Sequence, residues 1–183
     1  MKKLLIVVDM QKDFITGTLG SSQAQAIVPF VKTKIEEYRG SGGRIIFTKD
    51  THGGDYLETQ EGRRLSVVHC VAGTDGHDIA GELDTAGCEI FEKTSFGSSA
   101  LAEYLAETIG DTDEIELCGL CSDICVVSNA LILKARFPET LVTIDTRCCA
   151  GVTQKSHEAA LLTMKMCQVN VIGEREQEGG QIV

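Results

Sequence analysis

The sequence lacks the features of several protein classes. Its 183 residues include no tryptophan, and no apolar run approaches the roughly 20 residues that a membrane-spanning helix needs. The 17 Lys and Arg residues are outnumbered by 27 Asp and Glu residues, which gives a formal charge of -10. Nucleic acids and anionic membranes carry charge of the same sign, so we expect neither as a partner.

A secretion signal and a disulfide framework are not expected either. The apolar stretch in residues 1–9 is short, ends in an acidic residue and is not followed by a small-residue cleavage site, so it predicts a first strand. The eight cysteines are even in number, but a chain of this length needs no disulfide staples. We expect free, mostly buried thiols and a cytoplasmic protein.

Six short runs dense in Ile, Val, Leu or Phe predict strands that are covered on both faces. They span residues 3–9, 44–50, 88–93, 114–119, 140–145 and 168–172. Helical patterns lie between them, over residues 23–39, 98–109, 123–136 and 154–167. In the first helix Lys34 is the polar exception in an apolar stripe of period 3.6, whose other members are Ile27, Phe30, Val31, Ile35 and Tyr38.

This alternation predicts a three-layer α/β/α sandwich with a six-stranded, mainly parallel, doubly wound sheet. We expect one domain over residues 1–173 and a polar C-terminal tail over residues 174–183. Residues 51–86 break the alternation, show no clear strand and carry three of the four histidines. Because long irregular insertions in compact domains are often functional, we expect a binding site there.

Polar residues fall at the carboxyl ends of the predicted strands, which is where ligands bind in open α/β sheets. Asp9, Asp50 and Lys93 end the first three strands, and residues 119–125 form a turn after the fourth. Segments that are distant in the sequence therefore converge on one edge of the sheet. This convergence indicates an active site more strongly than any single residue does.

Cys125 lies about one turn into the helix that follows, with Ser122 or Asp123 as the expected N-cap. Free backbone N–H groups and the positive end of the helix dipole are expected to stabilise a thiolate there. Lys93 adds a positive charge, and Asp9 is a candidate proton acceptor and donor. These groups are the parts of an acyl-transfer site.

Three stretches resemble motifs of the isochorismatase-like cysteine hydrolases, and in particular their nicotinamidase branch. They are residues 5–14 (LIVVDMQKDF), 92–97 (EKTSFG) and 119–126 (GLCSDICV), in the order and spacing of that family. The resemblance extends from residue 3 to about residue 173. It implies the isochorismatase-like hydrolase fold, with Asp9 as the base, Lys93 as the charged third member and Cys125 as the nucleophile.

The resemblance also concerns the backbone of the turn before the nucleophile. In this family the peptide bond two residues before the motif aspartate is a cis non-proline bond, which implies a cis bond between Leu120 and Cys121. That bond would direct the Cys121 N–H into an oxyanion hole. The backbone N–H groups of Cys121 and Cys125 are the candidates for this hole.

Asp50 and His52 are two residues apart, so at strand periodicity both side chains leave the same face. Together with His69 they resemble the Asp-x-His…His metal site of nicotinamidases. Some relatives add a glutamate between the two histidines, for which Glu61 is the first candidate and Glu58 the second. These ligands imply a divalent metal, with zinc expected first and iron or manganese as alternatives, and no organic cofactor.

The remaining reactive residues are interpreted as structural. His77 is assigned to a loop, and His157, near the start of a helix, is assigned a capping or packing role. Cys70 is expected to be buried, and the vicinal pair Cys148 and Cys149 is expected to pack in a loop after the fifth strand.

The absence of tryptophan matters for the substrate. Nicotinamidases typically place one tryptophan between the metal Asp and His and another shortly before the second His. Here Thr51 fills the first position and residues 66–68 replace the second region. Because aromatic walls hold a pyridine ring by stacking, the identity of the amide stays open. We expect the substrate pocket to be lined by Phe14, Tyr56, Phe96 and Leu120.

The resemblance implies a metal-dependent amidohydrolase that converts nicotinamide and water to nicotinic acid and ammonia through a thioester on Cys125. One alternative keeps the same three residues but hydrolyses another small amide, or a carbamoyl or ureido compound. Another is a catalytically silent member of the fold that binds a ligand or partner. Isochorismate ether cleavage needs no cysteine nucleophile and is not favoured. By resemblance we expect a small-molecule amide substrate and a homodimer or homotetramer.

Overall fold

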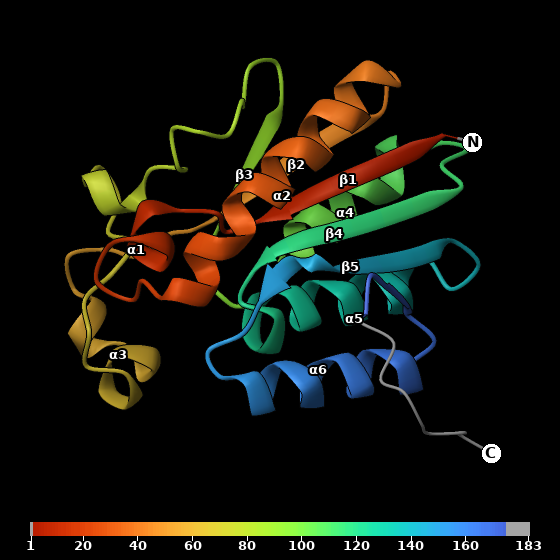
Figure 1. The fold of residues 1–183 in the computed structure, drawn as a ribbon. Coiled ribbons are helices and arrows are strands. Elements are labelled where there is room, and N and C mark those ends of the chain that lie inside the picture. The colour runs from red at the N-terminus through yellow and green to blue at the C-terminus, as the bar shows by residue number, and fades with distance from the viewer. Residues whose placement is uncertain (1, 175–183) are drawn as a thin grey trace.

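The computed structural model describes residues 2–174, and the predicted α/β/α sandwich is confirmed (Figure 1). One sheet has the strand order β3-β2-β1-β4-β5-β6, and every neighbouring pair is parallel. The strands are β1 (Lys3–Val8), β2 (Arg44–Asp50), β3 (Glu89–Lys93), β4 (Glu114–Leu120), β5 (Leu141–Ala150) and β6 (Asn170–Ile172). Apart from residue 174, the predicted tail lies outside the described residues.

The longer helices form the two outer layers. Helix α2 packs on β1, β2, β4 and β5, whereas α4, α5 and α6 pack against one another on the other face. The bounds are α1 (Lys12–Ile15), α2 (Ser22–Gly40), α3 (Gln60–Arg64), α4 (Ser99–Thr108), α5 (Val127–Arg136) and α6 (Gln154–Met166). The chain runs from β1 to one side of the sheet and from β4 to the other, so the strand order reverses between these two strands. Ligands of doubly wound sheets bind at this reversal.

The apolar stripe of α2 determines how this helix packs. Ser21 caps its N-terminus by accepting a hydrogen bond from the Ala24 N–H at 3.0 Å. The predicted stripe is buried with one exception, because the Phe30 side chain is 54% exposed. Lys34 is buried although it is charged, because carboxylates of β4 and β5 lie opposite it.

Strand β5 is longer than predicted. It runs through a register irregularity opposite β4 and ends at Ala150, so Cys148 and Cys149 belong to a strand. The prediction of a loop was wrong, because polar residues at 146–147 hide the continuation of the strand beyond the irregularity. Both thiols are buried, and all eight cysteines are free.

Residues 51–86 form no strand but contain α3 and two short 3₁₀ turns, η1 (Tyr56–Glu58) and η2 (Asp75–His77). The Thr51 N–H donates to Lys93 O at 2.8 Å, which attaches the start of the segment to the carboxyl end of β3. The His52 N–H donates to Cys70 O and its carbonyl accepts from Ala72 N, both at 2.9 Å, so residues 70–72 are held beside the same edge. Among residues 2–174, no helix is both long enough and apolar enough to cross a membrane.

Candidate active site

Asp9, Lys93 and Cys125 lie together at the carboxyl edge of the sheet. The Lys93 ammonium is 2.7 Å from Asp9 Oδ2 and 3.5 Å from Cys125 Sγ. All three residues are buried, with exposures of 0% for Asp9, 4% for Lys93 and 5% for Cys125. A carboxylate, an ammonium and a thiol are therefore in mutual reach in a site that is shielded from water.

The strand ends aim the two charged groups. β1 ends at Val8, and Asp9 then adopts a φ of 48°, a left-handed conformation that Asp tolerates better than most residues. The Asp9 N–H donates to Thr48 O at 3.2 Å, and the Thr48 hydroxyl donates to Asp9 Oδ1 at 2.6 Å. Lys93 is the last residue of β3 and stands in register beside Asp50 of β2.

The nucleophile follows a tightly packed turn. Gly119 has a φ of 117°, and a Cβ there would lie 2.1 Å from Val8 O, so β1 and β4 approach too closely for any side chain. The expected cis bond between Leu120 and Cys121 is present. Cys125 then lies in η3 (Ser122–Val126), one π-helical turn that continues directly into α5.

The predicted N-cap was wrong, because the side chains of Ser122 and Asp123 bind elsewhere. No side chain caps this turn. The fully buried Ser122 hydroxyl is 2.7 Å from His157 Nδ1, and the Asp123 carboxylate accepts from the Val152 N–H at 3.1 Å. Gly151 lies between the two segments, where a Cβ would be 2.9 Å from Ser122 Oγ. The turn is thereby attached to the start of α6.

Asn129 ties the nucleophile turn to the loop after β3. Its buried amide group donates to Cys125 O at 2.8 Å and to Phe96 O at 3.2 Å, and its Oδ1 accepts from the Ser98 N–H at 3.0 Å. Sequence reasoning missed this residue. The available signal was a polar side chain on the buried face of the helix, where an unsatisfied amide is costly.

The charge state of the thiol follows from its burial. Burial raises the pKa of Cys125 well above its ordinary value, Asp9 adds to the effect and Lys93 opposes it. Burial opposes the charge of Lys93 too, but Asp9 and Cys125 outweigh it and raise the pKa of Lys93. Burial thus favours the neutral thiol, and the Lys93 ammonium favours the thiolate that the sequence predicts. This arrangement suits proton transfer to Asp9 as the sulfur attacks.

Four potential metal ligands lie beside these three residues. One ligand atom from each of Asp50, His52, Glu61 and His69 falls within 4.8 Å of the others. His52 Nε2 is 2.8 Å from Asp50 Oδ2, and both histidine Nε2 atoms are 3.8 Å from Glu61 Oε1. Asp50 also connects the two groups, because its Oδ1 is 3.4 Å from the Lys93 ammonium.

The histidine nitrogens fit a metal ion. His69 Nδ1 is 2.7 Å from Val67 O, which only accepts, so Nδ1 carries the proton and Nε2 presents its lone pair to the cluster. His52 Nε2 is buried with no hydrogen-bond partner among the described residues. A bound cation would satisfy it. Two imidazoles and two carboxylates suit zinc, iron or manganese.

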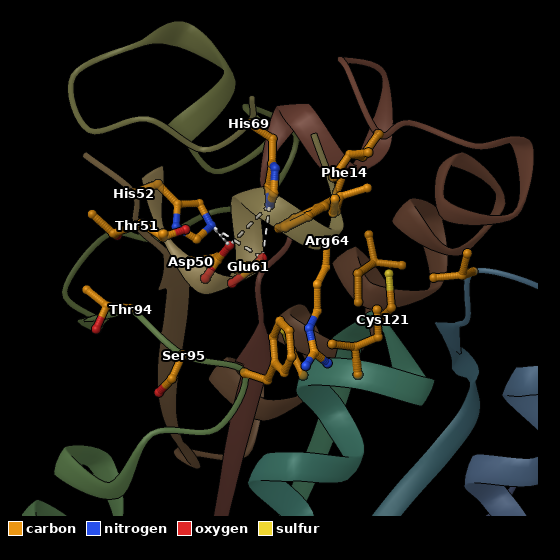
Figure 2. A pocket seen from close by; sticks show the side chains of 18 of the residues that line it. Phe14, Asp50, Thr51, His52, Glu61, Arg64, His69, Thr94, Ser95 and Cys121 are labelled. Carbon is orange, nitrogen blue, oxygen red and sulfur yellow. Dashed lines mark ion pairs between the residues drawn. The ribbon is translucent and has the colours of Figure 1, made fainter. Parts of the chain in front are cut away.

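A cavity of about 850 Å³ is lined by both Cys125 and the ligand cluster. Figure 2 shows the four residues of the cluster in this cavity. Phe14, Phe96 and Leu120 line it as predicted. Tyr56 does not, because it is 1% exposed and lies behind the histidines, with ring centroids 4.6 Å from His52 and 5.0 Å from His69. Further lining residues that the sequence did not suggest include Leu19, Arg64, Ile124 and Val152.

Comparisons with known proteins identify the family of this chain. The Isochorismatase domain model matches residues 3–176. The chain belongs to the isochorismatase domain family. One relative is the isochorismatase family protein PncA from Bacillus subtilis. It is 28% identical to this chain over 180 residues, which cover 88% of this chain and 93% of that protein.

Solved structures of this family superpose closely on the chain. The nicotinamidase/pyrazinamidase PncA from Bacillus subtilis is 27% identical with a TM-score of 0.80, covering 93% of this chain and 99% of that one. An N-carbamoylsarcosine amidase from Thermoplasma acidophilum is 26% identical with a TM-score of 0.77, covering 98% and 100%. A pyrazinamidase of Pyrococcus horikoshii, solved in complex with zinc, shares the fold. It is 24% identical with a TM-score of 0.81, and the match covers 94% of this chain and 99% of that one.

His77, His157 and Glu58 of this isochorismatase-family chain lie outside the ligand cluster. His77 is bound by Lys49 Nζ at 3.0 Å and Thr51 Oγ1 at 2.9 Å. His157 contacts Ser122, as described above, and does not face the metal ligands. Glu58 is exposed on η1, so Glu61 is the glutamate that the structure brings to the two histidines.

Proposed function

We propose that the protein is a metal-dependent cysteine amidohydrolase that hydrolyses nicotinamide, or a closely similar small carboxamide, to the acid and ammonia. The observation that carries this proposal is the single cavity onto which both Cys125 and the ligand cluster open. The thiol supplies a nucleophile, and the cluster supplies a place to hold a ring nitrogen. Relatives named as nicotinamidases support the choice of substrate.

In the first half of the reaction Cys125 Sγ attacks the amide carbonyl while its proton passes to Asp9. Lys93 holds the Asp9 carboxylate toward the thiol through their 2.7 Å ion pair. The oxyanion accepts hydrogen bonds from the N–H groups of Cys121 and Cys125. Asp9 then returns the proton to the departing nitrogen, so that ammonia leaves and a thioester remains on Cys125.

In the second half Asp9 takes a proton from water, and the resulting hydroxide attacks the thioester. The carboxylic acid leaves, and the sulfur regains its proton from Asp9. When bound, the metal would be held by Asp50, His52, Glu61 and His69, and would supply a Lewis acid for the ring nitrogen of the substrate and for a water molecule. The chain's own residues carry out each proton transfer.

The test is ammonia release from nicotinamide by wild type, Cys125→Ala and Cys167→Ala. Cys167 is exposed and does not line the cavity, so its loss is the matched control for removal of a thiol. We expect activity in wild type and Cys167→Ala, none in Cys125→Ala, and an acyl adduct on Cys125 by mass spectrometry after acid quenching. Equal activity in Cys125→Ala would exclude Cys125 as the nucleophile.

The same assay separates the alternatives. Adding an N-carbamoyl amino acid as a second substrate tests whether the protein hydrolyses carbamoyl compounds. The likeness to an N-carbamoylsarcosine amidase supports this alternative. Failure of every amide and carbamoyl compound would favour a silent binding protein. Elemental analysis of wild type and His69→Ala identifies the metal as zinc, iron or manganese. Light scattering tests the proposed homodimer or homotetramer, and fractionation of the native cells tests the proposed cytoplasmic location.

A further inference from the structure

One charged residue of the cavity has no role in the mechanism above. Arg64, at the end of α3, is the only lysine or arginine among the described residues that line the cavity. Figure 2 shows its side chain extending from α3 into the pocket, away from His69 and toward the helix that follows Cys121. The same pocket is lined by Cys125 and Ile124, so the exposed Arg64 and the candidate nucleophile share one cavity.

The local structure places Arg64 there. Arg64 follows Glu61 by three residues, so the two side chains share one face of α3. The helix is fixed by the Thr59 cap, which accepts from the Gly62 N–H at 3.0 Å, and by the Tyr56 hydroxyl, which donates to Leu65 O at 2.9 Å. The helix that supplies a metal ligand therefore also directs a cation into the cavity.

No carboxylate of residues 2–174 pairs with this guanidinium. Arg39, Arg44 and Arg147 each form an ion pair with a carboxylate, whereas Arg63, Arg64 and Arg136 form none among these residues. Of these three, Arg64 is the one that lines the cavity. Its neighbour Glu61 is directed instead to the histidine nitrogens of the ligand cluster. In a chain with a formal charge of -10, an unpaired arginine in the candidate active site is a specific local attraction for an anion.

The charges of the cavity favour the same interpretation. A divalent ion would neutralise the two carboxylates of the ligand cluster, which leaves Arg64 and the rim residue Asp55 as the remaining formal charges of the lining. Much of the rest of the wall is apolar, with Phe14, Phe96 and Leu120 among its members. A volume of about 850 Å³ lies in the upper part of the usual range for ligand pockets, roughly 300–1,000 Å³. The cavity thus has space for a substituent beyond one small ring.

We propose that Arg64 is a specificity-determining residue that selects carboxamides carrying a second, anionic group, in particular a carboxylate. This inference rests on the proposed amidohydrolase function and narrows its substrate class. The guanidinium would hold the carboxylate in a paired hydrogen-bond geometry while the amide carbon meets Cys125. Arg64 takes no part in bond making or proton transfer.

The test compares amides that differ only by the anionic group. Nicotinamide is paired with a pyridine carboxamide that bears a carboxylate meta to the amide, and butanamide with the half-amide of succinic acid. Values of kcat/KM come from ammonia release by wild type, Arg64→Gln and Arg64→Lys. Arg63→Gln is the matched control, because Arg63 is exposed on the same helix and does not line the cavity.

We expect wild type to prefer the anionic member of at least one pair. Arg64→Gln should lower the anionic-to-neutral ratio of kcat/KM by about 10- to 100-fold, the effect of losing a hydrogen bond to a charged group. Arg64→Lys should retain part of the preference, and Arg63→Gln all of it. A ratio that Arg64→Gln leaves unchanged, or that Arg63→Gln lowers equally, would overturn the inference.

A binding measurement distinguishes this inference from the proposed function. In the Cys125→Ala background, calorimetry compares the affinity of each amide with and without Arg64→Gln, at low and high salt. Tighter binding of the anionic amide that depends on Arg64 and weakens with salt would support the inference even if no amide were cleaved. Cleavage of nicotinamide without any anionic preference would refute the inference alone and leave the amidohydrolase function standing.

Discussion

Replacement of Lys34 by methionine is expected to cost a large part of the folding free energy. Lys34 is 8% exposed and forms ion pairs with Glu116 and, at 2.8 Å, with Asp145 Oδ2. The Tyr38 hydroxyl donates to Glu116 Oε2 at 2.7 Å. Methionine preserves the packing volume but leaves the buried Glu116 carboxylate without a cation, while Asp145 keeps its ion pair with Arg147 at 2.7 Å.

The magnitude follows from this loss of one partner. Breaking a buried ion pair costs about 3–5 kcal/mol, because the remaining charge stays desolvated. For a domain of this size each kcal/mol lowers the thermal midpoint by about 2–4 °C, so we expect a decrease of roughly 6–20 °C at neutral pH. Calorimetry and urea titration measure it. Lys32→Met, on the exposed face of the same helix, should remain close to wild type.

The pH dependence gives a second, independent check. Burial opposes the charge of Asp145, but hydrogen bonds from Arg147 and Lys34 outweigh it and lower its pKa from 3.8 to about 2. In wild type this stabilisation is therefore complete above about pH 4 and is lost as the pH falls toward 2.

In Lys34→Met, Asp145 keeps Arg147 but loses Lys34, so the pKa of Asp145 is lowered less than in wild type. The stability difference between the two proteins should consequently narrow as the pH is lowered from about 4 toward 2, where Asp145 becomes protonated in both. A difference below about 1 kcal/mol at pH 7, or one that does not change with pH, would refute the reasoning.

Two further predictions concern the site. Saturation with the metal at about 100 times its Kd should stabilise the protein by about 2.7 kcal/mol, which raises the thermal midpoint by about 5–10 °C. His69→Ala should lose this rise in the thermal midpoint, because His69 belongs to the ligand cluster, and His77→Ala should keep it, because His77 does not. A rise that persists in His69→Ala would contradict the assignment of His69 as a metal ligand. His157→Leu removes the partner of the buried Ser122 hydroxyl, and we expect kcat to fall by about 5- to 100-fold at unchanged KM, because an unsatisfied buried group costs about 1–3 kcal/mol. His157→Asn, whose amide can reach the same hydroxyl, should restore most of kcat; equal kcat in the two variants would exclude the hydrogen bond as the cause.

Local sequence pattern was sufficient for the sheet. The predicted bounds of β2 match the structure, and β1 stops one residue before the predicted end, where Asp9 turns into a left-handed conformation. Residues 4–8 of β1 and residues 45–47 of β2 are continuous apolar runs, so burial on two faces is visible in the sequence alone. β5 was underestimated because its second half follows a register irregularity, which depends on the partner strand and not on local composition.

The candidate site was predictable only in part, for a physical reason. Residues at strand ends, such as Asp9 and Lys93, converge because parallel strands share one edge, and the structure brings both to Cys125. Side chains in the insertion follow no such rule. Tyr56 was expected in the pocket but packs behind the histidines, and Arg64, which does line the pocket, carried no signal beyond its charge.

The pocket is lined by residues at the sheet edge and by residues of the segment 51–86. This division suggests that different parts of the chain determine the reaction and the choice of substrate. The nucleophile side is fixed by the sheet, where Gly119 excludes any side chain and Asn129 binds the carbonyl of Cys125. Substitutions there should alter kcat for every amide alike. Residues 51–86 supply another part of the wall, including Arg64 of helix α3, which is exposed over much of its length. Substitutions at Arg64 should therefore change which amide is accepted while the proposed thioester chemistry at Cys125 stays the same.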